Sequence, residues 1–200
     1  AWATTVVKVP LKPGAAAQLS AEIKDFDESF NLFAPHVRIM DLVDGVGGSE
    51  RHFKAAKKGN RVTLTTEDGN REWLVVSADH KPSPKALESA GHAARRESIK
   101  VSWALPLTGR VEVGQLSAFF PVKSDVTLSG RINAPWKLSD DRINVIECQF
   151  NFEILADVLP QLVVAARKDL LADGAYGRYV DVLPARGKEA LCLACPREDR

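Results

Sequence analysis

The hydrophobic positions near the start of the chain change from a strand-like to a helix-like spacing. Residues 4–11 are rich in β-branched side chains and end at prolines, which predicts a short strand. The next apolar residues are spaced by four, three, four and three positions, so they share one face of a predicted helix that Pro35 ends. These residues are Leu19, Ile23, Phe26, Phe30 and Phe33.

Between residues 37 and 77, apolar and polar positions alternate with a period of two, which predicts an antiparallel meander of short strands. Turn residues at 44–48 and 67–70 separate the strands. The second turn is a strong hairpin signal because Gly and Asn accept positive φ. Residues 79–96 are polar and basic, and we expect an exposed excursion that is partly helical after Pro84.

The second half of the chain predicts further strands and a long helix. The strands cover residues 99–105, 115–122 and 126–132. The apolar pattern after Asn151 predicts a helix that this residue caps and that ends at Asp173 and Gly174. Pro160 lies inside the run and predicts a kink or a break. The predicted fold class is therefore α+β, a mostly antiparallel sheet with an early and a late helix.

Composition narrows the classes of protein to which the chain can belong. Its 200 residues are 45% hydrophobic and 26% charged, which excludes a wholly disordered chain. The balance of 27 basic against 26 acidic residues gives a net charge of +1, so a cationic nucleic-acid clamp is a poor hypothesis. No apolar run approaches the roughly eighteen residues that a membrane-spanning helix needs, so no membrane partner is expected.

The ends of the sequence and its cysteines bear on cellular context. The chain begins Ala1-Trp2-Ala3 without an initiator Met or a signal-peptide pattern, so we interpret it as cut from inside a longer protein. Three cysteines are too few for a disulfide framework and favour a reducing, cytoplasmic compartment. Cys192 and Cys195 form a CxxC pair, which supplies only half of the ligands of a structural zinc, so we expect no metal there.

No self-contained catalytic constellation is readable. His36, His52, His80 and His92 are scattered, and we expect each of them to pack in the interior or to lie at the surface. The glycine-rich stretch 44–48 lacks the lysine of a P-loop and is not followed by a helical pattern, so it predicts a hairpin turn. The chain is therefore not expected to act as a hydrolase on its own.

The most informative stretch for chemistry is residues 130–142, which lies before the late helix. It ends in Arg142, and an arginine in such a loop could project outward and hold a phosphate with its forked pair of donors. An equally weighted alternative is that Asp140 or Asp141 neutralises this arginine.

Four segments follow one another in an informative order. They are TVVKVPLK at residues 5–12, FNLFAPHVRI at 30–39, FFPV at 119–122 and INAPWKLSDDR at 132–142. In this order they resemble sacsin-like members of the GHKL ATPase superfamily, which also contains the large heat-shock chaperones. The first segment is similar to the strand that closes the ATP-binding domain of that family. The last two are similar to a pair of motifs that precede a helix.

The resemblance implies that the chain follows an upstream ATP-binding domain and is comparable to a middle or transducer domain. Residues 1–14 would be the last strand of that domain or the linker from it. Residues 15–174 would form the transducer-like α+β domain, and residues 175–200 a C-terminal tail. By the same likeness, Arg142 is the first candidate for contact with the γ-phosphate of ATP, and Lys137 is the second.

ATP and Mg²⁺ are accordingly expected in the parent protein and not in this fragment. The ExxxN helix, DxGxG loop and glycine-rich lid of the family are not found, and Asp44 has Val46 where the loop needs a glycine. The chain would instead pass the nucleotide state to an unknown partner or client protein. Apolar surface left by the missing domain could also pair in a homodimer.

Two other functions remain as alternatives. The predicted hairpins over residues 51–77 could add a peptide strand at a sheet edge, which would make the chain an interaction module without an ATPase role. Arg95, Arg96 and the lysine-rich turns could bind nucleic acid, but the near-zero net charge disfavours this partner.

Overall fold

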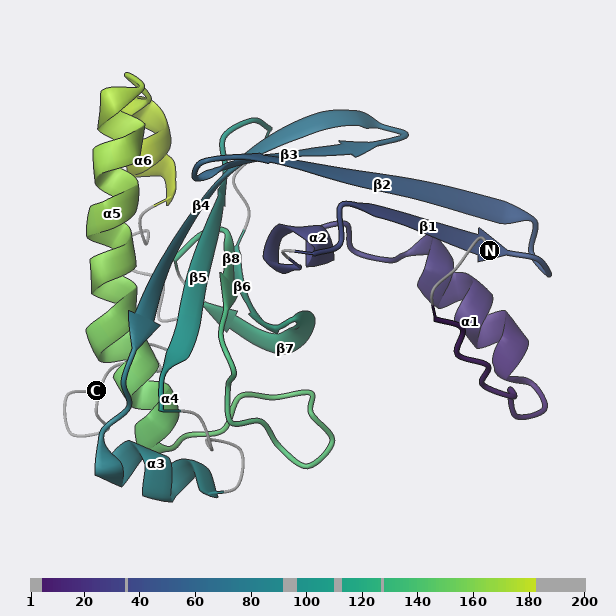
Figure 1. Ribbon diagram of the computed structural model, residues 1–200, viewed down its shortest axis with the longest axis horizontal. Helices are drawn as coiled ribbons and strands as arrows, with labels where there is room; N and C mark the ends of the chain where they lie inside the picture. Colours follow the sequence, from purple (N-terminus) through teal and green to yellow (C-terminus); the bar gives the residue numbers. More distant parts are fainter. Residues whose placement is uncertain (1–4, 35, 92–96, 110–112, 127, 183–200) are drawn as a thin grey trace.

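The fold is an eight-stranded sheet with helices, which confirms the predicted α+β class (Figure 1). A computed structural model describes residues 5–34, 36–91, 97–109, 113–126 and 128–182. The strand order in the sheet is β1-β2-β3-β4-β5-β8-β6-β7. All neighbouring strands pair antiparallel except β6 and β8, which pair parallel.

The first four strands form the predicted meander, and β5, the strand predicted after the excursion, continues it, so that each strand pairs with the next along the chain. The hairpin signal at residues 67–70 is confirmed, because Thr66 pairs with Gly69 across a two-residue turn between β3 and β4. These strands are β1 (Ile39–Asp44), β2 (Ser49–Lys58), β3 (Arg61–Thr66), β4 (Gly69–His80) and β5 (Ile99–Pro106).

The turn predicted at residues 44–48 connects β1 to β2. The Asp44 carboxylate accepts the N–H groups of Val46 at 3.0 Å and Gly47 at 2.9 Å. The Gly47 N–H, then the Ser20 side chain, hold the pKa of Asp44 below its usual value. A Cβ on Gly47 would lie 2.2 Å from this carboxylate, so a larger residue there would displace the Asp44 side chain from its present position. The stretch is thus a hairpin turn, as predicted.

The last three strands differ from the prediction. The single strand predicted over residues 115–122 is wrong, because the chain reverses at Phe119, where φ is 65°. The Phe119 N–H donates to the side-chain oxygen of Asn133 at 2.7 Å, and this bond fixes the reversal. The strand predicted over residues 126–132 forms only in its last part. The three strands are β6 (Gly114–Ala118), β7 (Phe120–Val126) and β8 (Arg131–Asn133).

Strand β8 inserts between β5 and β6, and its close approach to β5 depends on Gly130. This glycine has φ of 92°, and a Cβ there would lie 2.3 Å from the carbonyl oxygen of Ala104. Nearby, the indole N–H of the fully buried Trp103 donates to the Ser129 carbonyl at 2.8 Å. The chain thus enters β8 through backbone contacts that only glycine permits.

The N-terminal region also differs from the prediction. The continuous early helix is wrong: it is divided into α1 (Ala15–Lys24) and α2 (Phe30–Phe33). The Asp27 carboxylate accepts the Ser29 N–H at 2.8 Å, and this local bond competes with the helix. Residues 5–12 form no regular secondary structure, so the strand predicted there is also wrong. A strand needs a hydrogen-bonded neighbour, and the described sheet provides none for this segment.

The remaining helices lie after β4 and at the end of the chain. The helix predicted after Pro84 is confirmed, but the expectation that this excursion is exposed is wrong for α3, because Ala86 and Ala90 are buried in the large core. The interruption predicted at Pro160 is confirmed and is preceded by one π-helical turn. The late helix ends before Asp173 and Gly174, as predicted. These helices are α3 (Pro84–Ala90), α4 (Gln149–Glu153), η2 (Ile154–Val158), α5 (Leu159–Ala172) and α6 (Tyr176–Val182).

The sheet is buried on its two faces by different elements. The helix η2–α5 covers one face, and α2 lies over the other (Figure 1). Alternation along β4 supplies both sides, with Leu74 and Val76 in the large core and Trp73 and Val75 in the smaller one. The large core also contains Trp103, Leu105, Leu116, Ile132, Phe150, Ile154, Leu162 and Leu170. The smaller core contains Leu32, Phe33, Val62, Leu64 and Ala104.

Candidate functional site

The two candidate residues Lys137 and Arg142 lie on one short hairpin, residues 137–146. Leu138 and Val145 form an isolated antiparallel bridge, which defines the two arms. Lys137 is at the base of the hairpin, where its carbonyl accepts the N–H of Ile146 at 3.2 Å. Arg142 is in the four-residue tip. The structure thus brings both sequence candidates onto one hairpin, at its base and its tip.

The tip of the hairpin has a defined backbone conformation. The Ser139 carbonyl accepts the Arg142 N–H at 2.7 Å, and the Asn144 carbonyl accepts the Ser139 N–H at 2.9 Å. Arg142 has φ of 59°, which is a left-handed conformation that disfavours a residue with a side chain. Its side chain is exposed. An exposed arginine that is kept in an unfavourable backbone conformation is a reason to look for a function.

The aspartates of the tip are not ion-paired with Arg142. The Asp141 carboxylate accepts the hydroxyl of Ser139 and the N–H of Ile143, the latter at 3.0 Å. The Ser139 hydroxyl, followed by the Ile143 N–H, lowers the pKa of Asp141. Among the described residues, Arg142 forms no ion pair, so the alternative in which Asp140 or Asp141 neutralises it is not what the structure shows.

One buried side chain holds the base of the hairpin. Asn151 in α4 is 2% exposed, and its amide oxygen accepts the Lys137 N–H at 2.9 Å. Its amide nitrogen donates to the carbonyls of Lys137 at 2.8 Å and Ile146 at 2.7 Å. The prediction that Asn151 caps the late helix is therefore wrong. Helix α4 begins after Cys148, and Asn151 is free to turn its amide toward the hairpin.

Strand β7 supports the hairpin along its second arm. The Lys123 N–H donates to the Ile143 carbonyl at 2.8 Å, and the Val145 N–H donates to the Ser124 hydroxyl at 3.0 Å. The hairpin is thus fixed from α4 at its base and from β7 along its side. This support presents Arg142 at a defined place without the help of any ligand.

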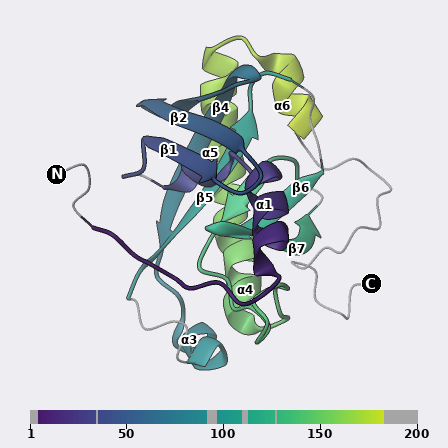
Figure 2. The ribbon, with the colours of Figure 1, turned by 90° about the vertical axis from the view of Figure 1, so that its right-hand side faces the viewer.

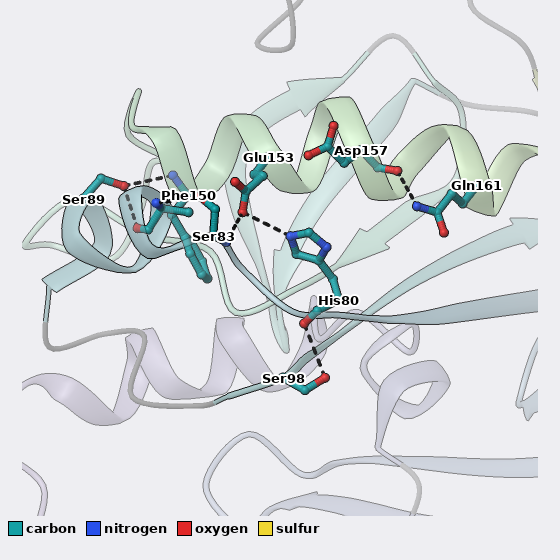
Figure 3. Close-up of polar contacts among 9 residues, drawn as sticks. His80, Ser83, Ser89, Ser98, Phe150, Glu153, Asp157 and Gln161 are labelled. Atoms are coloured by element: carbon teal, nitrogen blue, oxygen red, sulfur yellow. Dashed lines mark hydrogen bonds and ion pairs between the residues drawn. The ribbon is translucent and has the colours of Figure 1, made fainter.

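A second polar cluster ties the end of β4 to the late helices (Figure 3). The Glu153 carboxylate accepts the Ser83 N–H at 2.9 Å and lies 3.2 Å from Nε2 of His80. Burial of Glu153 raises its pKa, but the hydroxyl and N–H of Ser83, together with His80, outweigh burial and leave the pKa lowered. The Ser83 hydroxyl oxygen also accepts the Ala86 N–H at 3.1 Å and so caps α3.

This cluster does not have the geometry of a nucleophilic triad. In a triad, the histidine contacts the serine and the acid orients the histidine. Here the Glu153 carboxylate stands between Ser83 and His80, so the histidine has no hydrogen bond to the serine. The arrangement holds two segments together and has no general base beside a nucleophile. In the part of the chain that the structure describes, no group of three or more His, Cys, Asp or Glu is placed to bind a metal ion.

The other predicted candidates have varied locations. His52 is exposed on β2, and its hydrogen bond to Asp41 at 2.8 Å raises its pKa. His36 is exposed. Several residues lie outside the described ranges, so the structure does not place them. These are His92, Arg95, Arg96, Cys192 and Cys195.

The sheet edges are not where the sequence analysis expected them. Strands β2, β3 and β4 contain the predicted hairpins over residues 51–77, and each of them has a neighbour on both sides. The end strands of the described sheet are instead β1 and β7. The prediction of an exposed sheet edge at residues 51–77 is therefore wrong. Strand β1 pairs with β2 on one side of these strands, and β5 pairs with β4 on the other.

The role of Asn151 could not be identified from the sequence, because an asparagine just inside a helix resembles a cap until its distant partners are known.

Among the helices within the described residues, none has the length and apolar character to cross a membrane.

Comparison with known proteins gives no relative. No family model, curated protein or solved structure matches this chain.

Proposed function

We propose that this chain is a transducer-like domain, which couples the nucleotide state of an upstream ATP-binding domain to a partner or client protein. The observation that carries the proposal is the hairpin at residues 137–146. Its backbone is fixed by neighbouring elements, and its tip presents the exposed Arg142, which has no ion pair among the residues that the structure describes. The order of the four segments that resemble GHKL ATPases supports the same role.

Arginine suits a contact with a transferring phosphate. Its guanidinium stays charged at any physiological pH and offers forked donors to phosphate oxygens. A positive group placed at the γ-phosphate stabilises the charge of the transition state, and it loses its partner when the phosphate leaves. A side chain on a fixed hairpin can therefore both promote hydrolysis and report it. Lys137, at the base of the same hairpin, is the second candidate for this contact.

ATP and Mg²⁺ belong to the upstream domain in this proposal. The described chain contributes the hairpin and the rigid support behind it. Sheet contacts then connect the hairpin to the rest of the domain, because β7 pairs with β6 and β6 with β8. Movement of the hairpin relative to the nucleotide would thus be passed to the sheet and its helices.

The test is ATP turnover by the longer ATPase that contains this domain. Arg142→Ala should lower turnover by about a hundredfold and leave ATP affinity nearly unchanged, because the contact acts on the transition state. Arg167→Ala removes another exposed arginine, on α5, and is the matched control, which should keep normal turnover. Equal turnover in wild type and Arg142→Ala would contradict the proposal.

A further inference from the structure

A basic cleft lies on the sheet face that α2 partly covers, away from the Arg142 hairpin. Its volume is about 790 Å³. Helix α2 lines one side of the cleft, and residues of strands β1 to β5 line the other. Figure 2 looks toward this side of the sheet. The half-buried Val37 and Ala55 contribute apolar surface to the cleft, and Ser77 and Ser102 contribute a pair of hydroxyl groups 2.8 Å apart.

The charged residues that line the cleft are all basic. They are Arg38, Lys54, Lys57 and Lys100, and each is exposed. No acidic residue belongs to its described lining. Asp79 pairs in register with Lys100, but it does not line the cleft and forms no ion pair with that lysine. The cleft therefore favours an anionic ligand.

A buried amide in the cleft wall has no partner. Asn31 of α2 is 3% exposed, and neither its amide nitrogen nor its amide oxygen has a hydrogen-bond partner among the described residues. Buried polar groups are nearly always paired, and each one left unpaired costs stability. A turn of this side chain toward the cleft would let a ligand satisfy both atoms.

The chemistry of Asn31 selects among anionic ligands. An amide needs both an acceptor and a donor from its partner, and a peptide unit supplies one of each. An ionised phosphate supplies acceptors only and would leave the Asn31 oxygen unpaired. Nucleobases could pair with an amide, but single-stranded nucleic acids bind on exposed aromatic rings. Phe33 is the only described aromatic residue in the lining, and it is packed in the smaller core.

We propose that this cleft binds an acidic peptide segment in an extended conformation. Asn31 pairs with one peptide unit, Lys57, Lys100 and Arg38 hold its carboxylates, and the half-buried Val37 and Ala55 contact its aliphatic side chains. The site lies on the face of the sheet, between α2 and the strands, and does not require strand pairing at a sheet edge. The inference goes beyond the coupling role and does not depend on it, because peptide binding requires neither ATP nor an upstream domain.

The experiment is fluorescence anisotropy of a short labelled peptide, in which glutamate alternates with leucine, titrated with the full chain. Lys57→Glu should weaken binding by about fivefold, as expected when an exposed ion pair becomes a repulsion. Lys58→Glu is the matched control: it makes the same change of charge on the next residue of β2, which points to the opposite face and does not line the cleft. Its affinity should remain near that of the wild type.

A second variant separates binding from folding. Asn31→Leu keeps the branching of the side chain, and the cleft beside residue 31 has room for its larger volume, so it should weaken peptide binding while leaving the unfolding midpoint unchanged or higher. The proposal is overturned if the acidic peptide does not bind, or if Lys57→Glu and Lys58→Glu weaken it equally. Tighter binding of an oligothymidylate than of the peptide would also overturn it, in favour of a nucleic-acid site.

Discussion

Two asparagines in this fold are buried to nearly the same extent and have opposite surroundings. Asn151 is 2% exposed and forms three hydrogen bonds to the base of the hairpin at residues 137–146. Asn31 is 3% exposed, and its side-chain amide forms no hydrogen bond with the described residues. The Asn151 amide stabilises the fold, whereas the Asn31 amide is the one that we propose binds a ligand. The comparison therefore distinguishes the anchored hairpin at residues 137–146 from the cleft that is proposed to bind a peptide.

The charges of the two regions differ in the same way. At the hairpin, the Asp141 carboxylate accepts the Ser139 hydroxyl and the Ile143 N–H, which orders the tip and leaves Arg142 without an ion pair among the described residues. At the cleft, Lys57 and Lys100 lie on the same face of the sheet and have no ion-pair partner among the described residues. The hairpin therefore presents an arginine in a fixed backbone, whereas the cleft presents a broader basic surface.

The largest expected effect is on the rigid region. Asn151→Ala should lower the free energy of unfolding by about 2–4 kcal/mol, because it leaves buried backbone groups of Lys137 and Ile146 without partners. Urea unfolding of the chain measures this change. Asn144→Ala, at an exposed position of the same hairpin, should stay within about 0.5 kcal/mol of the wild type. Similar losses in the two variants would mean that Asn151 does not anchor the hairpin.

A smaller effect is expected at the second satisfied network, around Glu153. Because its pKa is lowered on folding, its carboxylate stabilises the fold above the ordinary value of 4.5, and this contribution is lost as the pH falls through the folded pKa. Glu153→Gln should cost about 1–2 kcal/mol at neutral pH and reduce the acid-side loss of stability. Thermal unfolding across the acid range checks both. If the variant has the same pH dependence of stability as the wild type, Glu153 does not contribute to the loss of stability in acid.

Replacing Arg142 at the hairpin tip should raise stability while removing the side chain that is proposed to contact the phosphate. Arg142→Gly relieves the left-handed conformation and should stabilise the isolated chain by about 1 kcal/mol. The same substitution at Arg167 in α5 should destabilise it by about 1 kcal/mol, because glycine weakens a helix. Urea unfolding of the two variants gives the signs. A loss of stability in Arg142→Gly would show that its backbone conformation is not strained.

The smallest expected effect is at the cleft. Asn31→Leu should leave the free energy of unfolding unchanged or raise it by up to about 1 kcal/mol, since it removes two unpaired buried atoms and adds apolar surface. Urea unfolding beside Asn151→Leu makes the comparison direct, because the second variant should be strongly destabilised. A large loss in Asn31→Leu would indicate internal partners for Asn31.

Local patterns predicted much of the fold. The alternation over residues 37–77 and the glycines of the turns indicated the meander, and Pro160 indicated the interruption of the late helix. Elsewhere the predicted elements were wrong because local hydrogen bonds and backbone conformations interrupt them. Asp27 accepts the Ser29 N–H and divides the early helix, and Phe119 reverses the chain in a conformation usually reserved for glycine. Such competition between local and distant bonds is not visible in a hydrophobic pattern.

The sequence indicated less of the candidate sites. The position of Arg142 before a helix suggested an outward arginine, and the structure places it at an exposed tip. The anchoring role of Asn151 depends on bonds to residues as far as fourteen positions away, so its helical context alone suggested a cap. The basic cleft joins Arg38, Lys57 and Lys100 from three separate segments, and only the folded sheet brings them together.

The most direct test of the central claim is to locate the γ-phosphate in the longer ATPase. An ATP analogue with a photoreactive group on its γ-phosphate would be bound, irradiated, and mapped by mass spectrometry of the labelled peptides. The account predicts label on the hairpin at residues 137–146. Label confined to the ATP-binding domain, with none on this hairpin, would contradict the proposal that Arg142 reaches the nucleotide.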